Sequence, residues 1–309
     1  MKKNNRKKIL IFGITGFIAT NLIKKLKNFR VIGVSRSQIK SMEGVENIFE
    51  YDEIANIKSL EYIDFALDFS SRVSVEEFVN SPIPTFNENV GISLRHLSLL
   101  NEIGFNGHYI YVTSDRAIAP NDKNDCLNDA KIKNDPYGAS KFFSELIIQY
   151  GLELSGVKKT VLRFPNLYGF NQKSGQLLPT ILSKISAGEL KISLNSFEGN
   201  RNYLHVEDAT DAILKFLQSP LDANSLCISG ENIEITYILE SIKKLFNKLT
   251  GKSLNFFEKK SANKRSLYLV PPPVLDDQIF RKTYNWQPQV SIQQGLLELL
   301  RDGVNNAKQ

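Results

Sequence analysis

A tyrosine and a lysine four residues apart, Tyr137 and Lys141, have the spacing in this chain that most directly suggests chemistry. They lie in the segment NDPYGASKFFSE, which is predicted to be helical, and residues four apart on a helix project from the same face. A free phenol has a pKa of about 10, and a nearby ammonium stabilises the phenolate and lowers that pKa. Tyr137 could then exchange a proton with a substrate oxygen. The alternative is that both side chains only share a solvated helix face.

A glycine loop near the start of the chain predicts a dinucleotide site. GITGFIA places Gly13 and Gly16 between an expected strand and an expected helix, with Phe17 and Ile18 opening the helix. Such a turn lets backbone amides approach a pyrophosphate, which the helix dipole also attracts. We expect these four residues to bind the cofactor. An ordinary strand-to-helix turn is the alternative.

The end of the second expected strand indicates which dinucleotide binds. An NAD site usually has an acidic residue there for the ribose 2′-hydroxyl, whereas this strand ends with Ser35 and Arg36. A hydroxyl and a guanidinium suit a 2′-phosphate, because arginine can pair with it through two hydrogen bonds. The prediction is NADP, with NAD as the alternative if Arg36 points to solvent.

The tyrosine and lysine are expected at the same edge of a sheet as the cofactor. The strand ending in YVTSD brings Ser114 to its carboxyl end, and Tyr137 opens the following helix. Ligands of an open parallel sheet lie at the carboxyl ends of its strands. Ser114 could therefore bond the substrate oxygen, and Lys141 could also bond the nicotinamide ribose.

Short apolar runs alternate with helical patterns in the first half of the chain. Strands are expected at 8–13, 30–35, 63–70, 108–114 and 159–169, and helices at 17–28, 87–104 and 136–154. This alternation predicts an α/β fold with a doubly wound parallel sheet of the Rossmann type. We expect a dinucleotide-binding domain over residues 1–165. A smaller, interleaved substrate-binding region is expected over 166–309, with segments near 200–230 packing back on the first domain.

Composition narrows the function classes. The hydrophobic content of 42% and charged content of 23% are ordinary for a globular protein. Two distant cysteines and three isolated histidines predict no metal site. The net charge of +6 owes much to MKKNNRKK at the start, which lacks interleaved aromatic residues and predicts a solvated tail rather than a nucleic-acid site. No membrane span is expected, and the cytoplasm is the expected location.

The order of five motifs resembles that of the extended short-chain dehydrogenase/reductase family. The motifs are GITGFIA, YVTSD, YGASK, LRFPNLYG and RNYLHVEDA. This family comprises nucleotide-sugar epimerases, dehydratases and reductases. The resemblance implies a catalytic set of Tyr137, Lys141 and Ser114, and commonly a homodimer packed through helices near 87–104 and 136–154. The segment DDQIFRKTYNWQPQVSIQQGL resembles the closing helix and strand of the family.

The resemblance also implies a nucleotide-sugar substrate. Arg201 matches the family's arginine that binds the nucleotide diphosphate, although it could instead make a surface ion pair, and Asn166 matches the family's substrate-binding asparagine. Ser114 and Asp115 are expected beside the substrate, and Phe164 beside the cofactor. Asp68, in DFSS where the family often has HLAA, is expected to be a substituted loop residue near the cofactor rather than a catalyst.

One departure from the family bears on the reaction. Sugar dehydratases of this group carry an Asp–Glu pair after the serine or threonine, but here Arg116 follows Asp115. An arginine stays protonated and cannot act as the base. The favoured function is NADPH-dependent reduction of a keto group on a nucleotide-linked deoxysugar. The alternatives are an NAD-dependent nucleotide-sugar epimerase and a non-catalytic NADP-sensing protein.

Overall fold

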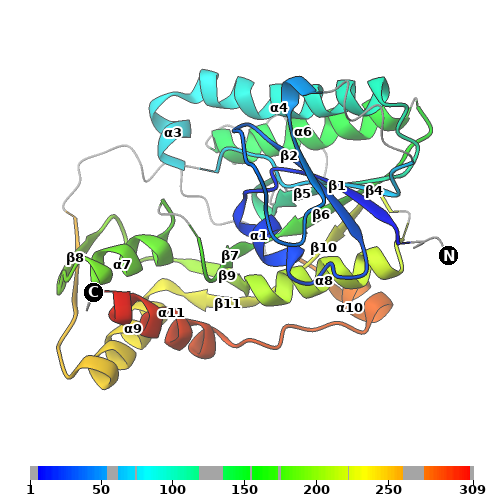
Figure 1. Ribbon diagram of the computed structural model, residues 1–309. Coiled ribbons are helices and arrows are strands. Elements are labelled where there is room, and N and C mark those ends of the chain that lie inside the picture. The colour runs from blue at the N-terminus through cyan, green and yellow to red at the C-terminus, as the bar shows by residue number, and fades with distance from the viewer. Residues whose placement is uncertain are drawn as a thin grey trace.

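The computed structural model describes residues 6–53, 62–73, 75–117, 135–153, 155–172, 175–221, 223–259 and 275–306. Residues 1–5 of the predicted basic tail MKKNNRKK lie outside these ranges, and its last residue, Lys8, is the first residue of the strand β1 (Lys8–Phe12). The described residues form two lobes, a large sheet flanked by helices and a smaller mixed lobe (Figure 1).

Seven parallel strands form the large sheet, in the order β10-β6-β5-β4-β1-β2-β3. The strands are β1 (Lys8–Phe12), β2 (Arg30–Ser35), β3 (Asn47–Glu50), β4 (Phe65–Asp68), β5 (His108–Ser114), β6 (Lys158–Phe164) and β10 (Ser225–Cys227). The chain moves outward from β1 to β3 and then restarts with β4 on the other side of β1. The doubly wound fold predicted from the sequence is thus confirmed. A crevice is expected at this reversal point, beside the carboxyl ends of β1 and β4.

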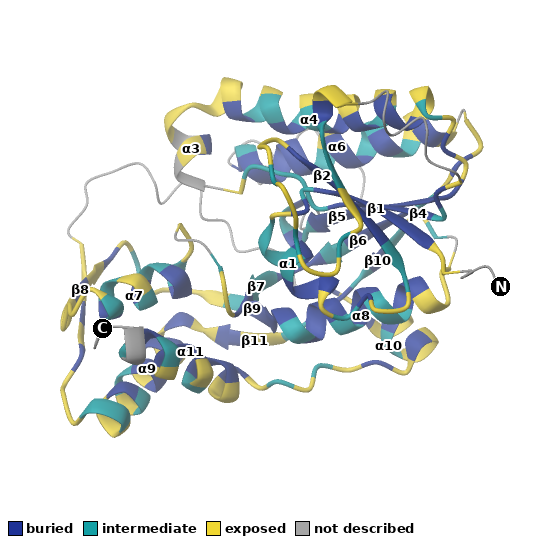
Figure 2. Cartoon of the chain, viewed as in Figure 1, coloured by how far each residue is buried: buried dark blue, intermediate teal, exposed yellow. Residues whose placement is uncertain are grey.

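Helices cover both faces of this sheet. One face carries α3 (Val75–Asn80), α4 (Pro82–Glu102) and α6 (Pro136–Glu153), and the other carries α1 (Phe17–Ile23), α8 (Val206–Gln218) and α10 (Gln278–Tyr284). Alternate residues of β1 belong to different cores: Ile9 and Ile11 pack on the α8 side, and Leu10 and Phe12 on the α4 side. Since successive side chains of a strand face opposite ways, this explains why the expected strands are apolar throughout. Figure 2 shows the strands buried and the outer helix faces exposed.

The smaller lobe has its own core, built from helices and two short sheets. β11, β9 and β7 form one sheet, and β12 and β8 form the other. The bounds are β7 (Asn166–Tyr168), α7 (Leu177–Ser186), β8 (Lys191–Leu194), β9 (Asn200–His205), β11 (Glu231–Glu234), α9 (Ile235–Thr250), β12 (Asn255–Glu258) and α11 (Ile292–Asn306). Two single turns complete the described elements, η1 (Tyr51–Glu53) and η2 (Asp115–Ala117).

The first helix is shorter than predicted, and around residue 205 a strand continues directly into a helix. α1 ends at Ile23 instead of residue 28, because the amides of Lys25 and Leu26 bond carbonyls only three residues back and tighten the chain into turns. No loop separates β9 from α8, since His205 ends the strand and caps the helix by accepting a hydrogen bond from the Glu207 amide at 3.3 Å.

The expected closing helix and strand are two helices, α10 and α11. Ser291 and Gln294 form a reciprocal cap at the start of α11: the Ser291 amide donates to Gln294 Oε1 at 3.0 Å, and the Gln294 amide donates to Ser291 Oγ at 3.3 Å. This Ser-x-x-Gln pattern in the sequence predicts the start of a helix, but the resemblance to the family's closing strand was followed instead.

Among the described residues, no helix combines the length and apolar character that crossing a membrane requires. In the same ranges, no three His, Cys, Asp or Glu side chains gather in a way that could hold a metal ion.

Candidate active site

The glycine loop after β1 is closed against the turn after β4. Gly13 has a φ of +73°, and its amide donates to the Val34 carbonyl at 3.2 Å. A Cβ at Gly13 would lie 3.0 Å from Ser70 Oγ and 3.2 Å from the Ser70 amide nitrogen. Both the backbone conformation and the close approach therefore require glycine. Gly16 follows in extended backbone, and Phe17 and Ile18 are half-buried at the start of α1. Glycine at both ends of the loop allows the close backbone approach that the pyrophosphate of a dinucleotide needs.

The residues expected to choose the cofactor lie at the end of β2. Ser35 is buried, and its hydroxyl accepts a hydrogen bond from the Ser37 amide at 3.2 Å. Arg36 is exposed, and its Nη1 donates to Glu88 of α4 at 3.1 Å. Arg36 is therefore held by an ion pair and does not simply point to solvent.

Ser114, Tyr137 and Lys141 lie at the carboxyl edge of the sheet. Ser114 ends β5, and its hydroxyl donates to Asp115 Oδ1 at 2.9 Å. Tyr137 is the second residue of α6 and is buried against the edge of Phe78, with ring centroids 5.5 Å apart. Lys141 is buried one turn later on the same helix face. The two residues do not share a solvated surface.

The Lys141 ammonium has a partner behind the site. Its Nζ donates to the Tyr111 hydroxyl at 3.0 Å and lies 4.8 Å from the Tyr111 ring centroid. Tyr111 is buried within β5. A lysine carries three donors, so this contact fixes the ammonium and uses only one of them.

The net pKa shift of Tyr137 differs from the expectation. Burial raises the pKa of the Tyr137 phenol above its ordinary value, the Lys141 ammonium opposes that rise, and Asp115 adds to it. Lys141 thus acts in the predicted direction but does not outweigh burial. The phenol keeps its proton at neutral pH and is suited to donate it.

A buried ion pair ties the Ser114 turn to the start of the Tyr137 helix. Arg116 Nε lies 2.7 Å from Asp135 Oδ2, with both side chains largely buried. Asp135 immediately precedes α6, and its Oδ1 accepts a hydrogen bond from the Gly138 amide at 3.0 Å. A Cβ at Gly138 would collide with the Arg116 carbonyl oxygen. Arg116 occupies the position at which the resemblance implies a glutamate in dehydratases, and its cationic side chain therefore has a structural role here.

The expectation that Asp68 is a loop residue is wrong. Asp68 is the last residue of β4 and is fully buried. Its carboxylate accepts hydrogen bonds from His96 Nδ1 at 2.5 Å, the Tyr109 hydroxyl at 2.6 Å and the Ser70 amide at 2.8 Å. The far nitrogen of His96 lies 2.7 Å from the Tyr51 hydroxyl. The network holds the turn whose Ser70 touches the glycine loop.

These bonds also set the charge of Asp68. Burial raises the pKa of the carboxyl, but the charge and hydrogen bond of His96, with the bonds from Tyr109 and Ser70, hold it below its ordinary value. Asp68 is therefore a carboxylate with a structural role beside the cofactor loop.

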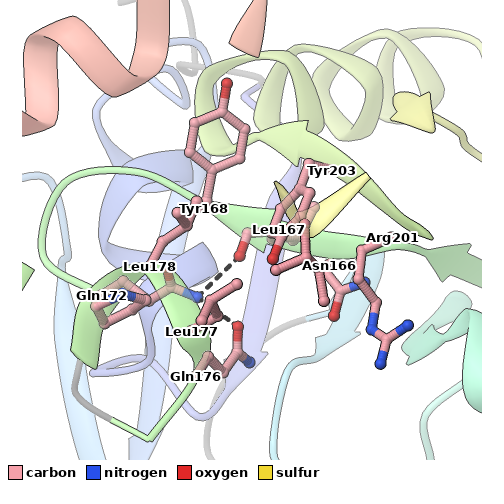
Figure 3. A pocket seen from close by; sticks show the side chains of 11 residues that line it. Asn166, Leu167, Tyr168, Gln172, Gln176, Leu177, Leu178, Arg201 and Tyr203 are labelled. Carbon is pink, nitrogen blue, oxygen red and sulfur yellow. Dashed lines mark hydrogen bonds between the residues drawn. The ribbon is translucent and has the colours of Figure 1, made fainter. Parts of the chain in front are cut away.

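Asn166 and Arg201, which the resemblance matches to substrate binding, line a cavity in the smaller lobe (Figure 3). The cavity has a volume of about 170 Å³ and is formed by β7, the loop after it, α7 and β9. Asn166 Nδ2 donates to the Asn202 carbonyl at 3.1 Å, and Arg201 Nη1 donates to the Asn200 carbonyl at 2.8 Å. Burial lowers the pKa of Arg201, and Asp115 opposes that shift. Arg201 thus lies within electrostatic reach of the Ser114 turn.

Phe164 and Asp115, two further residues expected at the site, are both buried. Phe164 is buried at the end of β6, opposite Ser114 in the register, and belongs to the large core. Asp115 is buried in the η2 turn, where it accepts the Ser114 hydroxyl.

A protein-family comparison assigns the chain to a family. Residues 9–228 match the model of the NAD dependent epimerase/dehydratase family. The chain belongs to the NAD-dependent epimerase/dehydratase family. Membership agrees with the resemblance to extended short-chain dehydrogenases and makes this chain an NAD(P)-dependent enzyme of that type.

Curated members of the family with similar sequences carry out different reactions. The human dTDP-D-glucose 4,6-dehydratase is 24% identical, over 75% of this chain and 71% of that protein. CDP-abequose synthase of Salmonella muenchen is 24% identical, over 95% of this chain and 97% of that protein. The trifunctional UDP-glucose 4,6-dehydratase/UDP-4-keto-6-deoxy-D-glucose 3,5-epimerase/UDP-4-keto-L-rhamnose-reductase RHM2 of Arabidopsis thaliana is 21% identical over 94% of this chain, which spans 46% of that longer protein. Together these matches support a nucleotide-sugar-modifying enzyme that uses NAD or NADP.

Solved structures in the family share the fold. The UDP-glucose 4-epimerase of Thermotoga maritima, with UDP-glucose, has a TM-score of 0.75 at 22% identity over 95% of this chain and 97% of that one. RMD from Pseudomonas aeruginosa, with NADPH, has a TM-score of 0.73 at 19% identity over 97% and 99%. The Thermus thermophilus UDP-glucose 4-epimerase, with NAD, has a TM-score of 0.75 at 18% identity over 96% and 98%. At these identities the likeness shows the fold alone.

Reasoning from the sequence missed the partners that hold the site. Arg116 pairs with Asp135, Lys141 with Tyr111, and Asp68 with His96. The one available signal was a polar Asp68 at the end of a strand that is otherwise apolar, because a buried carboxylate needs hydrogen-bonding partners.

Proposed function

We propose that this protein reduces a keto group on a nucleotide-linked deoxysugar with NADPH, as a homodimer in the cytoplasm. The observation that favours reduction is Arg36 at the end of β2, since a guanidinium suits the 2′-phosphate of NADPH. The pairing of Arg116 with Asp135 beside Ser114 argues against dehydration. The resemblance implies that a dehydratase needs a glutamate at position 116. A protonated, ion-paired arginine cannot take a proton from the sugar, so reduction or epimerisation remains.

The described residues divide the work of a reduction among them. A reduced nicotinamide, when bound, supplies the hydride. Ser114 would hold the substrate oxygen through its hydroxyl, and Tyr137 would donate its proton to that oxygen as negative charge develops there. Burial raises the pKa of the phenol, so Tyr137 carries its proton at neutral pH, and the Lys141 ammonium opposes that rise and favours release of the proton. The two remaining donors of Lys141 would orient the nicotinamide ribose.

Substrate binding is assigned to the cavity of the smaller lobe. Arg201 would pair with the nucleotide diphosphate, since a guanidinium binds phosphate oxygens through two hydrogen bonds. Asn166 would contact the substrate beside it. Relatives that carry nucleotide-sugar names support this class of substrate.

An NAD-dependent nucleotide-sugar epimerase is the second candidate, and Glu88 favours it. Its carboxylate reaches Arg36 at the end of β2, where an acidic group would accept a ribose 2′-hydroxyl. In that case the bound nicotinamide would be recycled rather than consumed.

The test offers the full chain NADPH and a panel of nucleotide 4-keto-6-deoxysugars, with loss of reduced-nicotinamide absorbance as the readout. Consumption that disappears in Tyr137→Phe is expected. No consumption across the panel, together with interconversion of a nucleotide sugar in the presence of NAD, would establish the epimerase. If Tyr137→Phe kept the wild-type function in the cell although it consumed no NADPH, the protein would instead be a non-catalytic NADP sensor.

The homodimer is proposed through the outer faces of α4 and α6. These helices lie side by side and expose apolar side chains at Ile83, Leu94, Phe143 and Tyr150. Exposed apolar side chains gathered on one face are typical of interfaces. Light scattering should give twice the chain mass, and Leu94→Glu should give a monomer, whereas Tyr237→Glu on α9 should not change the mass.

A further inference from the structure

Two arginines from different strands converge on one carboxylate oxygen beside the glycine loop. Arg36 Nη1 lies 3.1 Å from Glu88 Oε1, and Arg72 Nε lies 2.8 Å from the same atom. Arg36 directly follows β2, Arg72 follows β4, and Glu88 belongs to α4. Of these three residues, only Arg36 was predicted from the sequence to bind the cofactor.

The topology places this cluster around the cofactor loop. β2 and β4 are the two neighbours of β1 in the sheet, and the glycine loop leaves β1 between them. The turn after β4 touches that loop through Ser70 and then continues to Arg72. Arg36 and Arg72 therefore approach the loop from its two sides, at the edge of the sheet where the adenosine ribose of a dinucleotide is recognised.

The position of Arg72 is built into the fold. Its amide donates to Asn89 Oδ1 at 2.7 Å, and Asn89 Nδ2 donates to its carbonyl at 3.2 Å. Asn89 is itself buried and reaches Ser140 of α6 at 3.0 Å. The backbone of Arg72 is thus fixed, while its side chain remains 41% exposed and accessible to a ligand.

The shared acceptor defines what these guanidiniums can hold. Because Arg36 Nη1 and Arg72 Nε both donate to one oxygen atom, they lie within the span of a single phosphate group, whose oxygens accept charge-assisted hydrogen bonds at about 2.8 Å. Glu88 acts in the opposite sense: its charge repels a phosphate but can accept a hydrogen bond from a hydroxyl.

We propose that Arg72 joins Arg36 in binding the 2′-phosphate of NADPH, and that Glu88 limits the preference for that phosphate over a free 2′-hydroxyl. The inference rests on the proposed NADPH-dependent function and adds two residues that determine cofactor specificity. The cofactor preference is the balance between two guanidiniums and one carboxylate.

The test measures binding to the full chain by titration calorimetry. The probes are NADP⁺ and NAD⁺, together with adenosine 2′,5′-bisphosphate and 5′-AMP, which isolate the 2′-phosphate. Arg72→Gln should weaken binding of both 2′-phosphorylated probes about tenfold or more, as expected for one charge-assisted hydrogen bond. It should leave NAD⁺ and 5′-AMP within about twofold. Glu88→Gln should tighten NADP⁺ and weaken NAD⁺.

Arg30→Gln is the matched control, because Arg30 pairs with Glu46 at the opposite end of β2. It should change none of the four affinities, and melting curves would confirm that each variant is folded. Equal losses for NADP⁺ and NAD⁺ in Arg72→Gln would overturn the inference and assign Arg72 to the pyrophosphate or to structure. A wild-type chain that prefers NAD⁺ would overturn the proposed cofactor itself. Preference for NADP⁺ lost in Arg36→Gln but kept in Arg72→Gln would overturn only the present inference.

Discussion

The Asp68 network should be the most sensitive polar cluster among the described residues, and Asp68→Asn tests it. The substitution keeps the shape of the side chain but removes the charge that accepts hydrogen bonds from His96, Tyr109 and the Ser70 amide. Because hydrogen bonds to a charged group contribute about 1.5–3 kcal/mol each, we expect a loss of about 3 kcal/mol or more. For a chain of this size, about 3 kcal/mol corresponds to a fall in melting temperature of roughly 5 °C.

Two milder variants provide a scale for this loss. Tyr109→Phe removes one of the hydrogen bonds to the Asp68 carboxylate, which should cost about 1.5–3 kcal/mol because the acceptor is charged. Tyr51→Phe removes the hydroxyl that contacts the far nitrogen of His96 and should cost about 1 kcal/mol. Urea unfolding followed by circular dichroism would give all three free energies.

Asp68→Asn should also weaken cofactor binding, because the turn that Asp68 holds carries Ser70 against Gly13. The pH dependence has a definite sign. Since the pKa of Asp68 is held below its unfolded value, its stabilisation is present above the ordinary carboxyl range and is lost as pH falls through the folded pKa. A loss under 1 kcal/mol near neutral pH, or a difference between wild type and variant that grows in acid, would refute this account.

Three further predictions concern the catalytic edge. Lys141→Met should lower turnover and move the alkaline limb of the pH profile of kcat/KM to higher pH, because the Lys141 ammonium opposes the rise in the pKa of Tyr137. An alkaline limb at the same pH as in the wild type would contradict that electrostatic role. Tyr111→Phe removes the hydroxyl that fixes Lys141, so kcat should fall roughly tenfold, as for one lost hydrogen bond to a charged group, and an unchanged kcat would show that the contact is incidental. Gly138→Ala should reduce kcat and stability, because the added Cβ would meet the backbone at Arg116. Gly91→Ala is the control, since the space around Gly91 is open, and its free energy of unfolding in urea should rise by about 1 kcal/mol. Equal effects of the two substitutions would be evidence against the close approach at Gly138.

The fold was predictable because its signals are local. Apolar runs between helical patterns predicted the central strands, and a glycine loop between strand and helix predicted where the sheet reverses. β3 escaped detection: Asn47–Glu50 is a short edge strand with only two apolar residues, too few for a strand signal. α11 carried a capping signal that the resemblance to a closing strand outweighed.

The site was predictable only as far as residue types and spacing reach. Tyr137 and Lys141 share a helix, so their common face follows from a spacing of four. The contacts that hold the site join residues far apart in the chain. Tyr111 lies 30 residues before its partner Lys141, and Asp68 lies 28 residues before its partner His96. Such pairs depend on the strand register and on the helix that covers it, which no local pattern encodes. The net pKa of Tyr137 likewise depends on burial, which spacing does not reveal.

The outermost strand β10 has a consequence for how this chain is made. It joins the large sheet beside β6, yet roughly 60 residues, including β7 to β9, separate the two strands, and closing so long a loop is slow. During synthesis the edge of β6 stays open until residue 227 has left the ribosome. The nascent sheet then presents unpaired backbone groups that invite aggregation. An expression host with ample chaperone capacity should therefore raise the soluble yield.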